Sequence, residues 1–221
     1  MTEHLSSSSP TLLTMNLVTT ILQHPLLWTV SQKIFGCDKQ KHALYRGAFS
    51  GPCTMLDFGC SNGNTFEAFR DFTYYGLDID PRLIADAQKK FAAENNARFV
   101  CADVLEHPFP DEFFDAILFA GTGHHLEDGL FPRIMDALGR MVKIGGSIHF
   151  FDVLRSPGED SALLRLLIHL DQGKFHRTEA RYRAMLPTIS KTLRPVQMKT
   201  MRIRGTLMPQ PQYFYAEMKR I

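Results

Sequence analysis

Three aspartates, Asp57, Asp78 and Asp103, each follow a short apolar run of the chain. Stretches with helical periodicity separate these runs, which is the pattern of βαβ units that build a parallel sheet. Because the carboxyl ends of parallel strands meet at one edge, we expect the three carboxylates to gather there. Ligands of open α/β sheets bind at that edge.

A turn of small residues, Gly59-Cys60-Ser61-Asn62-Gly63, comes directly after the first of these strands. Gly59 and Gly63 allow the backbone to approach a ligand closely. Asp78 stands 21 positions after Asp57, and an acid about 20 residues further on, at the end of the neighbouring strand, can bind ribose hydroxyls. Asp103 could accept a hydrogen bond from an adenine amino group. The pattern therefore predicts a site for an adenosine-containing ligand.

Two other nucleotide sites fit this turn less well. A dinucleotide fingerprint has the spacing G-x-G-x-x-G, whereas Gly59 and Gly63 are four apart and Ser61 stands between them. A P-loop is excluded because no Lys-Ser/Thr pair follows the turn. An oxidoreductase that binds NAD(P) remains as an alternative.

Residues 56–63 (LDFGCSNG), 76–79 (GLDI), 114–119 (FDAILF), 123–126 (GHHL) and 142–147 (VKIGGS) stand in the order and at the spacing of one known family. The chain resembles the class I S-adenosylmethionine-dependent methyltransferases, of the bacterial small-molecule type. Ser61 departs from the family motif, which has glycine there. A positive φ at this position would strain a serine.

The resemblance implies a set of cofactor contacts. Asp57 and the turn would hold the methionine end, Asp78 the ribose hydroxyls, and Ile79 one face of the adenine. Asp103 and Val104 would lie at the adenine edge, and Ala120 beneath the cofactor. The full set of expected cofactor-binding residues is Asp57, Gly59, Cys60, Ser61, Gly63, Asp78, Ile79, Asp103, Val104 and Ala120.

A hydroxyl acceptor must lose a proton during methyl transfer, so we considered which side chains could act as a base. His124 and His125 follow the fourth strand, where the acceptor should lie, and Asp152 ends the fifth. Arg177 could bind an anionic acceptor, because nine basic residues face one acid between Lys174 and Arg204. No cysteine pair has C-x-x-C spacing, and no metal site is expected.

The resemblance implies an α/β fold with a doubly wound, mostly parallel, seven-stranded Rossmann-like sheet of order 3-2-1-4-5-7-6. Residues 1–9 are expected to be a disordered tail, residues 10–48 an N-terminal helical cap, and residues 49–221 the methyltransferase domain, with a helical insertion at about 156–190. Two segments, Val196–Thr206 and Tyr213–Lys219, should form an antiparallel pair at the sheet edge.

The chain has 221 residues, of which 44% are hydrophobic and 22% charged, with four cysteines and a formal net charge of +2. This composition excludes a disordered or fibrous chain and favours a reducing, cytoplasmic compartment. The uncharged stretch 5–32 is too polar for a membrane span. We expect methyl transfer to oxygen or nitrogen of a small acceptor, with no membrane and with nucleic acid disfavoured. A non-catalytic, methyltransferase-like binding subunit is the alternative.

Overall fold

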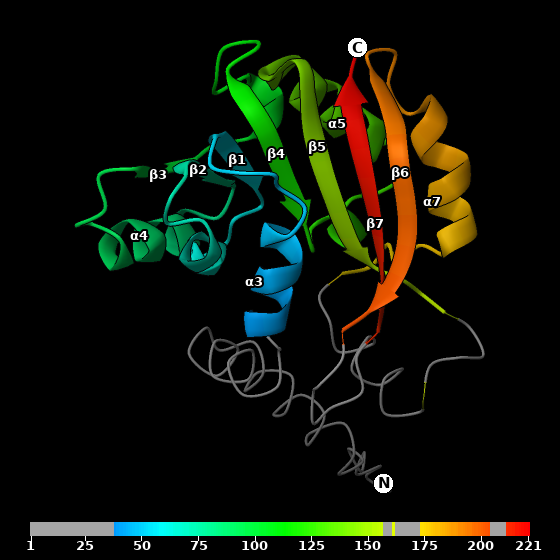
Figure 1. Cartoon of the computed structure of the whole chain (residues 1–221), viewed down its shortest axis with the longest axis horizontal. Helices are drawn as coiled ribbons and strands as arrows, with labels where there is room; N and C mark the ends of the chain where they lie inside the picture. The colour runs from blue at the N-terminus through cyan, green and yellow to red at the C-terminus, as the bar shows by residue number, and fades with distance from the viewer. Residues whose placement is uncertain (1–37, 157–160, 162–172, 204–210) are drawn as a thin grey trace, which may run out of the picture.

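The computed structural model describes residues 38–156, 161, 173–203 and 211–221, and these build one twisted sheet with helices on both faces (Figure 1). The sheet has seven strands in the order β3-β2-β1-β4-β5-β7-β6. The predicted strand order is therefore confirmed. The sequence predicts a disordered tail at residues 1–9, a helical cap at 10–48 and a helical insertion at about 156–190, and much of this lies outside the described residues. Of the cap, the structure describes α3 (Asp38–Arg46) and residues 47 and 48.

Five strands run parallel and alternate with helices, as the pattern of apolar runs predicts. They are β1 (Thr54–Phe58), β2 (Thr73–Asp78), β3 (Ala97–Cys101), β4 (Phe114–Ala120) and β5 (Val142–Val153). Strand β5 begins earlier than expected, because Gly145 and Gly146 form a bulge inside it, where the pairing with β4 shifts register. Gly145 has a φ of +78°, which suits glycine.

The last two strands, β6 (Leu193–Arg202) and β7 (Gln212–Arg220), pair with each other antiparallel. Strand β7 also pairs antiparallel with β5, from Ser147↔Lys219 to Val153↔Tyr213. The sheet is therefore mixed, and β6 forms its outer edge. The expected antiparallel pair is confirmed.

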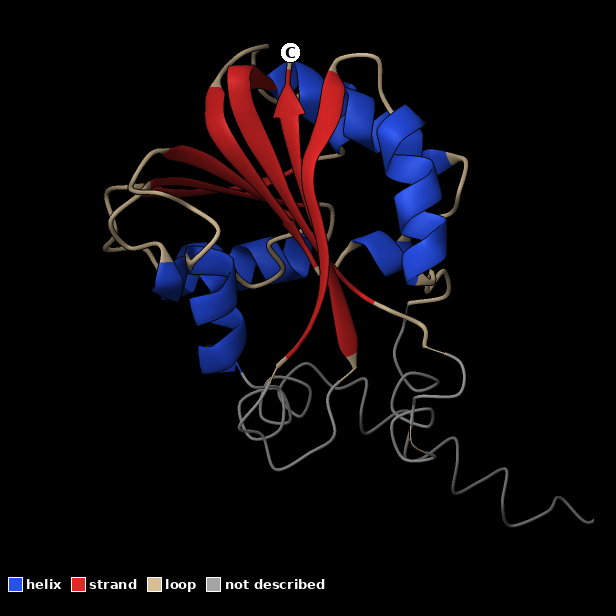
Figure 2. Ribbon diagram, turned by 45° about the vertical axis from the view of Figure 1, so that its right-hand side comes forward, coloured by secondary structure: helices blue, strands red, loops and turns tan. Residues whose placement is uncertain are grey.

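Helices lie on both faces of the sheet (Figure 2). Each face carries its own hydrophobic core. One face is covered by α3, the 3₁₀ helix η1 (Asn64–Ala68) and α4 (Pro81–Lys90). The other is covered by η2 (Val104–Glu106), α5 (Leu130–Met141), α7 (Glu179–Met185) and η4 (Leu186–Thr188). Alternate residues of each strand serve opposite cores, as Leu118 and Phe119 do in β4.

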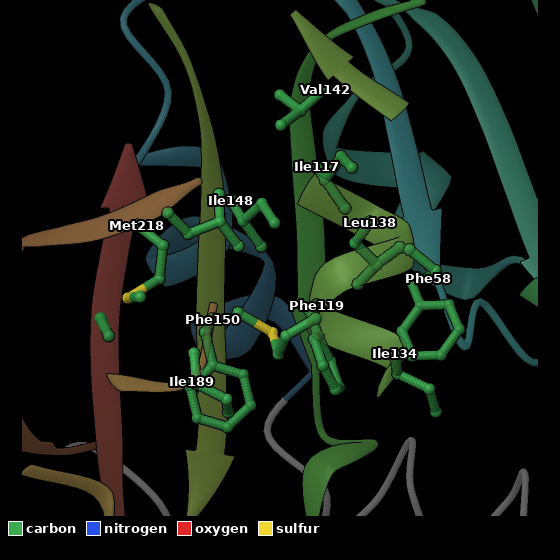
Figure 3. Packing of buried hydrophobic residues seen from close by; sticks show 14 of the residues in the cluster. Phe58, Ile117, Phe119, Ile134, Leu138, Val142, Ile148, Phe150, Ile189 and Met218 are labelled. Carbon is green, nitrogen blue, oxygen red and sulfur yellow. The ribbon is translucent and has the colours of Figure 1, made fainter. Parts of the chain in front are cut away.

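The core on the α5 side is built from buried aliphatic and aromatic side chains of β1, β4, β5 and β7. Figure 3 shows how these side chains meet those of α5. The labelled members are Phe58, Ile117, Phe119, Ile134, Leu138, Val142, Ile148, Phe150, Ile189 and Met218. Packing on both faces holds the carboxyl ends of the parallel strands at fixed positions, which a binding site requires.

Local sequence explains where the helices begin. Asp80 caps α4 by accepting from Arg82 N at 2.8 Å, and Pro81 takes the first helical position, as predicted. Thr178 caps α7 in the same way, accepting from Arg181 N at 3.3 Å. Between β1 and β2, where the periodicity of the sequence predicts a helix, the chain forms only the short 3₁₀ helix η1. The aromatic side chain of Phe66 anchors this short helix in the core.

Candidate active site at the carboxyl edge of the sheet

The turn after β1 has the backbone of a close-approach loop. Gly59, Ser61 and Gly63 have φ angles of +75°, +52° and +75°. Gly59 N and Cys60 N both donate to Leu77 O of β2, at 2.8 and 3.1 Å. A side chain at position 59 would collide with Thr122, since a Cβ there would lie 2.2 Å from its Oγ1. The turn is therefore closed against both β2 and the loop after β4.

Ser61 has a positive φ, the left-handed conformation that the sequence analysis identified as a source of strain for a serine. A non-glycine residue pays roughly 1–2 kcal/mol for this conformation. One contact that helps hold the residue there is the bond from Ser61 N to Asp78 Oδ2, at 2.9 Å. The second oxygen of Asp78 accepts from Asp80 N, also at 2.9 Å. The Asp78 carboxylate thus lies at the turn, at the end of β2, where its position suits ribose recognition.

The other two aspartates lie near the same edge but have different surroundings. Asp57 pairs with Gly76 one step before the strand end and is 2% exposed. It accepts a hydrogen bond from the Tyr74 hydroxyl. Asp103 caps η2 by accepting from Leu105 N at 2.9 Å, and Val104 behind it is buried. The three acids are gathered near one edge, and of them Asp78 alone bonds the backbone of the glycine turn.

Burial raises the pKa of Asp57 to about 7, and the nearby Asp78 charge adds to this effect. The hydroxyl of Tyr74 acts in the opposite direction by bonding the carboxylate. Strongly perturbed pKa values cluster at functional sites, so Asp57 is a candidate for one.

The loop after β4 connects the glycine turn to a second polar network. Gly121 has a φ of +66°, and a Cβ built on it would meet nothing within 4 Å. Two residues further on, Gly123 packs so closely on Asp152 that a Cβ there would lie 2.6 Å from Oδ2. His124 follows in the 3₁₀ helix η3 (Gly123–His125) and is buried, whereas His125 is exposed.

His124 and Asp152, which the sequence presented as separate candidates, contact each other. His124 Nδ1 lies 2.5 Å from Asp152 Oδ1. The other carboxylate oxygen accepts from the hydroxyl of Tyr182 on α7. Asp152 is fully buried, Tyr182 is fully buried, and His124 is 5% exposed. Burial, with the Asp152 charge, raises the pKa of the Tyr182 phenol, so this hydroxyl remains a donor.

The segment after residue 172 packs over the His124 ring. The ring of His176 stacks on it with centroids 4.8 Å apart and an interplanar angle of 10°. Phe175 N donates to His124 O at 2.9 Å. A Cβ on Gly173 would lie 2.0 Å from His124 Cδ2, so only glycine fits there without a shift. This segment therefore forms one wall of the site.

The predicted role of Arg177 as an acceptor contact needs correction. Its guanidinium is buried and is engaged by the chain itself. It donates to Gly123 O and Leu126 O, at 2.9 and 2.6 Å, and pairs with Asp128. The buried cation fastens the 173–178 segment to the loop after β4. The excess of basic residues around it predicted recognition of an anion, but the buried guanidinium bonds backbone carbonyls of the chain itself.

Four contributors to the site were missed: Tyr74, Thr122, Gly173 and Tyr182. Tyr74 and Tyr182 are single aromatic residues within a strand and a helix, and nothing in their spacing marks them as partners of aspartates. Gly173 lies near the start of the basic segment, where no pattern indicates that another side chain approaches its backbone. Thr122, inside the predicted loop, could have been found from its position after Gly121. His149, another histidine of the region, is buried in β5.

Comparisons with known proteins agree with this geometry. Residues 55–146 match the family described as "Methyltransferase domain". A tRNA (carboxymethyluridine(34)-5-O)-methyltransferase of Arabidopsis thaliana is 28% identical over 125 residues, which cover 56% of this chain and 30% of that protein. A fatty-acid O-methyltransferase of Mycolicibacterium smegmatis is 30% identical over 105 residues, covering 44% and 36%.

Among solved structures, the geranyl diphosphate C-methyltransferase of Streptomyces coelicolor A3(2), in complex with Mg²⁺, geranyl diphosphate and S-adenosyl-L-homocysteine, superposes with a TM-score of 0.64. Its sequence identity is 15%, and the match covers 83% of this chain and 77% of that one, so it bears on the fold alone. Residues 55–146 are therefore similar to methyltransferase domains, and the sheet has the strand order that the resemblance to the class I S-adenosylmethionine-dependent enzymes implies. The chain spans about a third of the length of the curated relatives described above.

The residues at the strand ends fit the cofactor that this family uses. Asp78 offers carboxylate oxygens beside the turn, and Ile79 next to it is 70% exposed, an apolar surface suited to an adenine ring. Gly121 borders open space, which leaves room opposite the turn. Within the described residues, no cluster of three or more His, Cys, Asp or Glu side chains could hold a metal ion, and no helix is long and apolar enough to cross a membrane.

Ser61→Gly should raise the free energy of unfolding by up to about 1 kcal/mol, because glycine adopts a positive φ without steric cost. Ser61→Val should lower it by more, since a β-branched residue fits this conformation worst. Denaturant unfolding would measure both. Ser50→Gly, at an exposed site with no positive φ, is the control and should not stabilise. A Ser61→Gly variant that is less stable than the wild type would contradict the conclusion that the backbone at Ser61 is strained.

Arg177→Ala should lower the free energy of unfolding by about 2–3 kcal/mol, because it leaves the carbonyls of Gly123 and Leu126 without their buried donor. Arg181→Ala is the matched control, since Arg181 pairs with the same Asp128 but is 55% exposed. It should cost less than about 1 kcal/mol. Urea unfolding of both variants measures these losses of stability. Equal losses would contradict the conclusion that Arg177 fastens the 173–178 segment to the loop after β4.

Asp57→Asn should raise the melting temperature by a few degrees at pH 8 and leave it nearly unchanged at pH 4. The folded protein holds a proton on Asp57 up to about pH 7, whereas the unfolded chain releases it near pH 4. Stability from this group therefore falls as the pH rises from 4 to 7, and the amide removes that loss. Asp86→Asn, on the exposed side of α4, should show no such pH-dependent difference in thermal scans.

Proposed function

We propose that this chain is a methyltransferase that uses S-adenosylmethionine to methylate an oxygen or nitrogen of a small-molecule acceptor. The observation that carries the proposal is the contact between Ser61 N and Asp78, which fixes a carboxylate at the mouth of a left-handed glycine turn. The exposed Ile79 stands directly beside it. The match of residues 55–146 to the methyltransferase domain supports the same cofactor.

When bound, S-adenosylmethionine supplies an electrophilic methyl group on a sulfonium. The expected cofactor contacts come from the turn and the strand ends, with Asp78 accepting from the ribose hydroxyls and Ile79 covering the adenine. The protein's main contribution is alignment of the acceptor and exclusion of water, which can supply roughly 7–11 kcal/mol of barrier reduction. In this proposal His124 takes the proton from the acceptor, and its contact with Asp152 supports that role.

A small acceptor is favoured by the burial of this pair. His124 is 5% exposed and is covered by His176 and Gly173, so a bulky polymer could not reach it without displacing them. The relatives include a fatty-acid O-methyltransferase. An anionic acceptor is not part of this proposal, because its expected contact, Arg177, is engaged within the chain.

An RNA acceptor is the second candidate. One relative is a tRNA methyltransferase by name, and its match covers more of this chain than the domain model does. The basic side chains that suggested such a partner are partly neutralised, since Arg181 pairs with Asp128 and Arg183 with Glu179. These pairings weaken the electrostatic argument for a phosphate backbone.

Calorimetry with S-adenosylhomocysteine tests the cofactor assignment. Wild-type protein should bind, and Asp78→Ala should weaken binding by at least about tenfold, equivalent to about 1.4 kcal/mol. The matched control is Asp86→Ala, which removes an exposed carboxylate from α4 and should bind as the wild type does. Absence of binding would favour a non-catalytic subunit, and binding of NADH instead would favour an oxidoreductase.

A further inference from the structure

The polar network around Asp152 extends across three elements that are distant in the sequence. His124 comes from the loop after β4, Asp152 from β5, and Tyr182 from α7. Each carboxylate oxygen has its own partner, with Oδ1 facing His124 Nδ1 and Oδ2 accepting from the Tyr182 hydroxyl. Asp152 and Tyr182 are fully buried, so water does not compete for these bonds.

We propose that Tyr182 is a positioning residue that holds Asp152 so that His124 keeps its proton on Nδ1 and presents Nε2 as a base toward an acceptor hydroxyl. This inference rests on the proposed function and narrows its acceptor class to one that is methylated on oxygen. Tyr182 does not touch the acceptor; it acts through the carboxylate. An acceptor amine that is already neutral would have no need of such a base.

The tautomer follows from the chemistry of the three groups. The Tyr182 phenol can only donate to the carboxylate while it is protonated, and burial keeps it so. An ionised carboxylate has no proton to give, so it accepts from His124 Nδ1–H at 2.5 Å. Nε2 then carries the lone pair of the neutral ring.

The surrounding packing prevents the ring from turning. Gly173 lies against Cδ2 and Nε2, since a Cβ there would be 2.0 and 3.0 Å from these atoms. His176 stacks on one face, and the ring of His125 lies 4.4 Å from that of His124. Arg177, through Gly123 O, fixes the backbone on which His124 sits. Another titratable group near the pair, within the described residues, is Tyr45, whose pKa is raised by burial and also by the Asp152 charge.

The chemical step in this proposal is the transfer of the methyl group to the acceptor oxygen. The acceptor oxygen forms a bond to the methyl carbon as the bond between that carbon and sulfur breaks, and the sulfur keeps the electron pair. The hydroxyl proton passes to His124 Nε2, and the imidazolium is stabilised by Asp152. The proton then leaves to solvent, which restores the neutral ring.

The test is the tautomer of His124, read by nitrogen-15 NMR of histidine-labelled full-length protein at pH 8. Wild-type protein should show His124 protonated on Nδ1. Tyr182→Phe should lose this single state and give a mixture with the Nε2-protonated form. Tyr215→Phe is the matched control, because Tyr215 is a buried phenol that contacts a different histidine, His149, at 3.1 Å. It should leave the His124 signals unchanged.

Two results would overturn the proposal. One is a wild-type His124 protonated on Nε2, a measurement that needs no variant. The other is a folded Tyr182→Phe protein in which His124 keeps the wild-type tautomer. Should Tyr182→Phe not fold, Asp152→Asn serves instead: its amide can donate to Nδ1, so the tautomer should invert, and an unchanged ring would refute the role of Asp152 and with it that of Tyr182.

Calorimetry separates this proposal from the function on which it rests. Tyr182→Phe should bind S-adenosylhomocysteine with wild-type affinity, since the residue lies on α7, away from the glycine turn. If wild-type protein does not bind S-adenosylhomocysteine, the proposed function is refuted, whereas the measured tautomer of His124 is unaffected. A changed tautomer with intact binding is the combination that supports a positioning role.

Discussion

The parallel alignment of β1, β2 and β4 is the constraint on which the site depends. Parallel strands end at one edge, and here the turn after β1 is tied to β2 by two bonds to Leu77 O and by one to Asp78. It is also packed against Thr122 of the loop after β4. These contacts bring three segments of the chain to one place before any ligand is considered. The left-handed conformation of Ser61 is a cost of that arrangement.

A buried aspartate that accepts a hydrogen bond from a tyrosine hydroxyl occurs on both faces of the sheet. On the α3 and α4 side, Asp57 accepts from the hydroxyl of Tyr74, and on the α5 and α7 side, Asp152 accepts from that of Tyr182. A buried carboxylate without a donor would be expensive, and a phenol supplies a donor while adding apolar surface to the core. Each aspartate is thereby held next to the site while the hydrophobic packing around it continues.

Buried ionisable groups are concentrated at this edge. Asp57, Asp152 and Arg177 are each at most 5% exposed. Such groups contribute little to stability compared with apolar residues of similar size, because their desolvation offsets their interactions. Their presence here is better explained by positioning: Arg177 fastens the loop that carries His124, and Asp152 orients the ring of His124. Backbone strain at Ser61 and buried ionisable groups therefore occur together at this edge of the sheet.

The sequence by itself determined the order and type of most elements, because apolar periodicity and caps such as Asp80 are local signals. It also determined which carboxylates would reach the edge, since strand ends follow from the same pattern. Only the tertiary structure decided the partners. It joined His124 to Asp152, added Tyr182 from a distant helix, and directed Arg177 into the protein instead of toward a ligand. Those contacts link residues 28 to 54 positions apart, and no local pattern encodes them, because packing of the two cores sets the distances between their backbones.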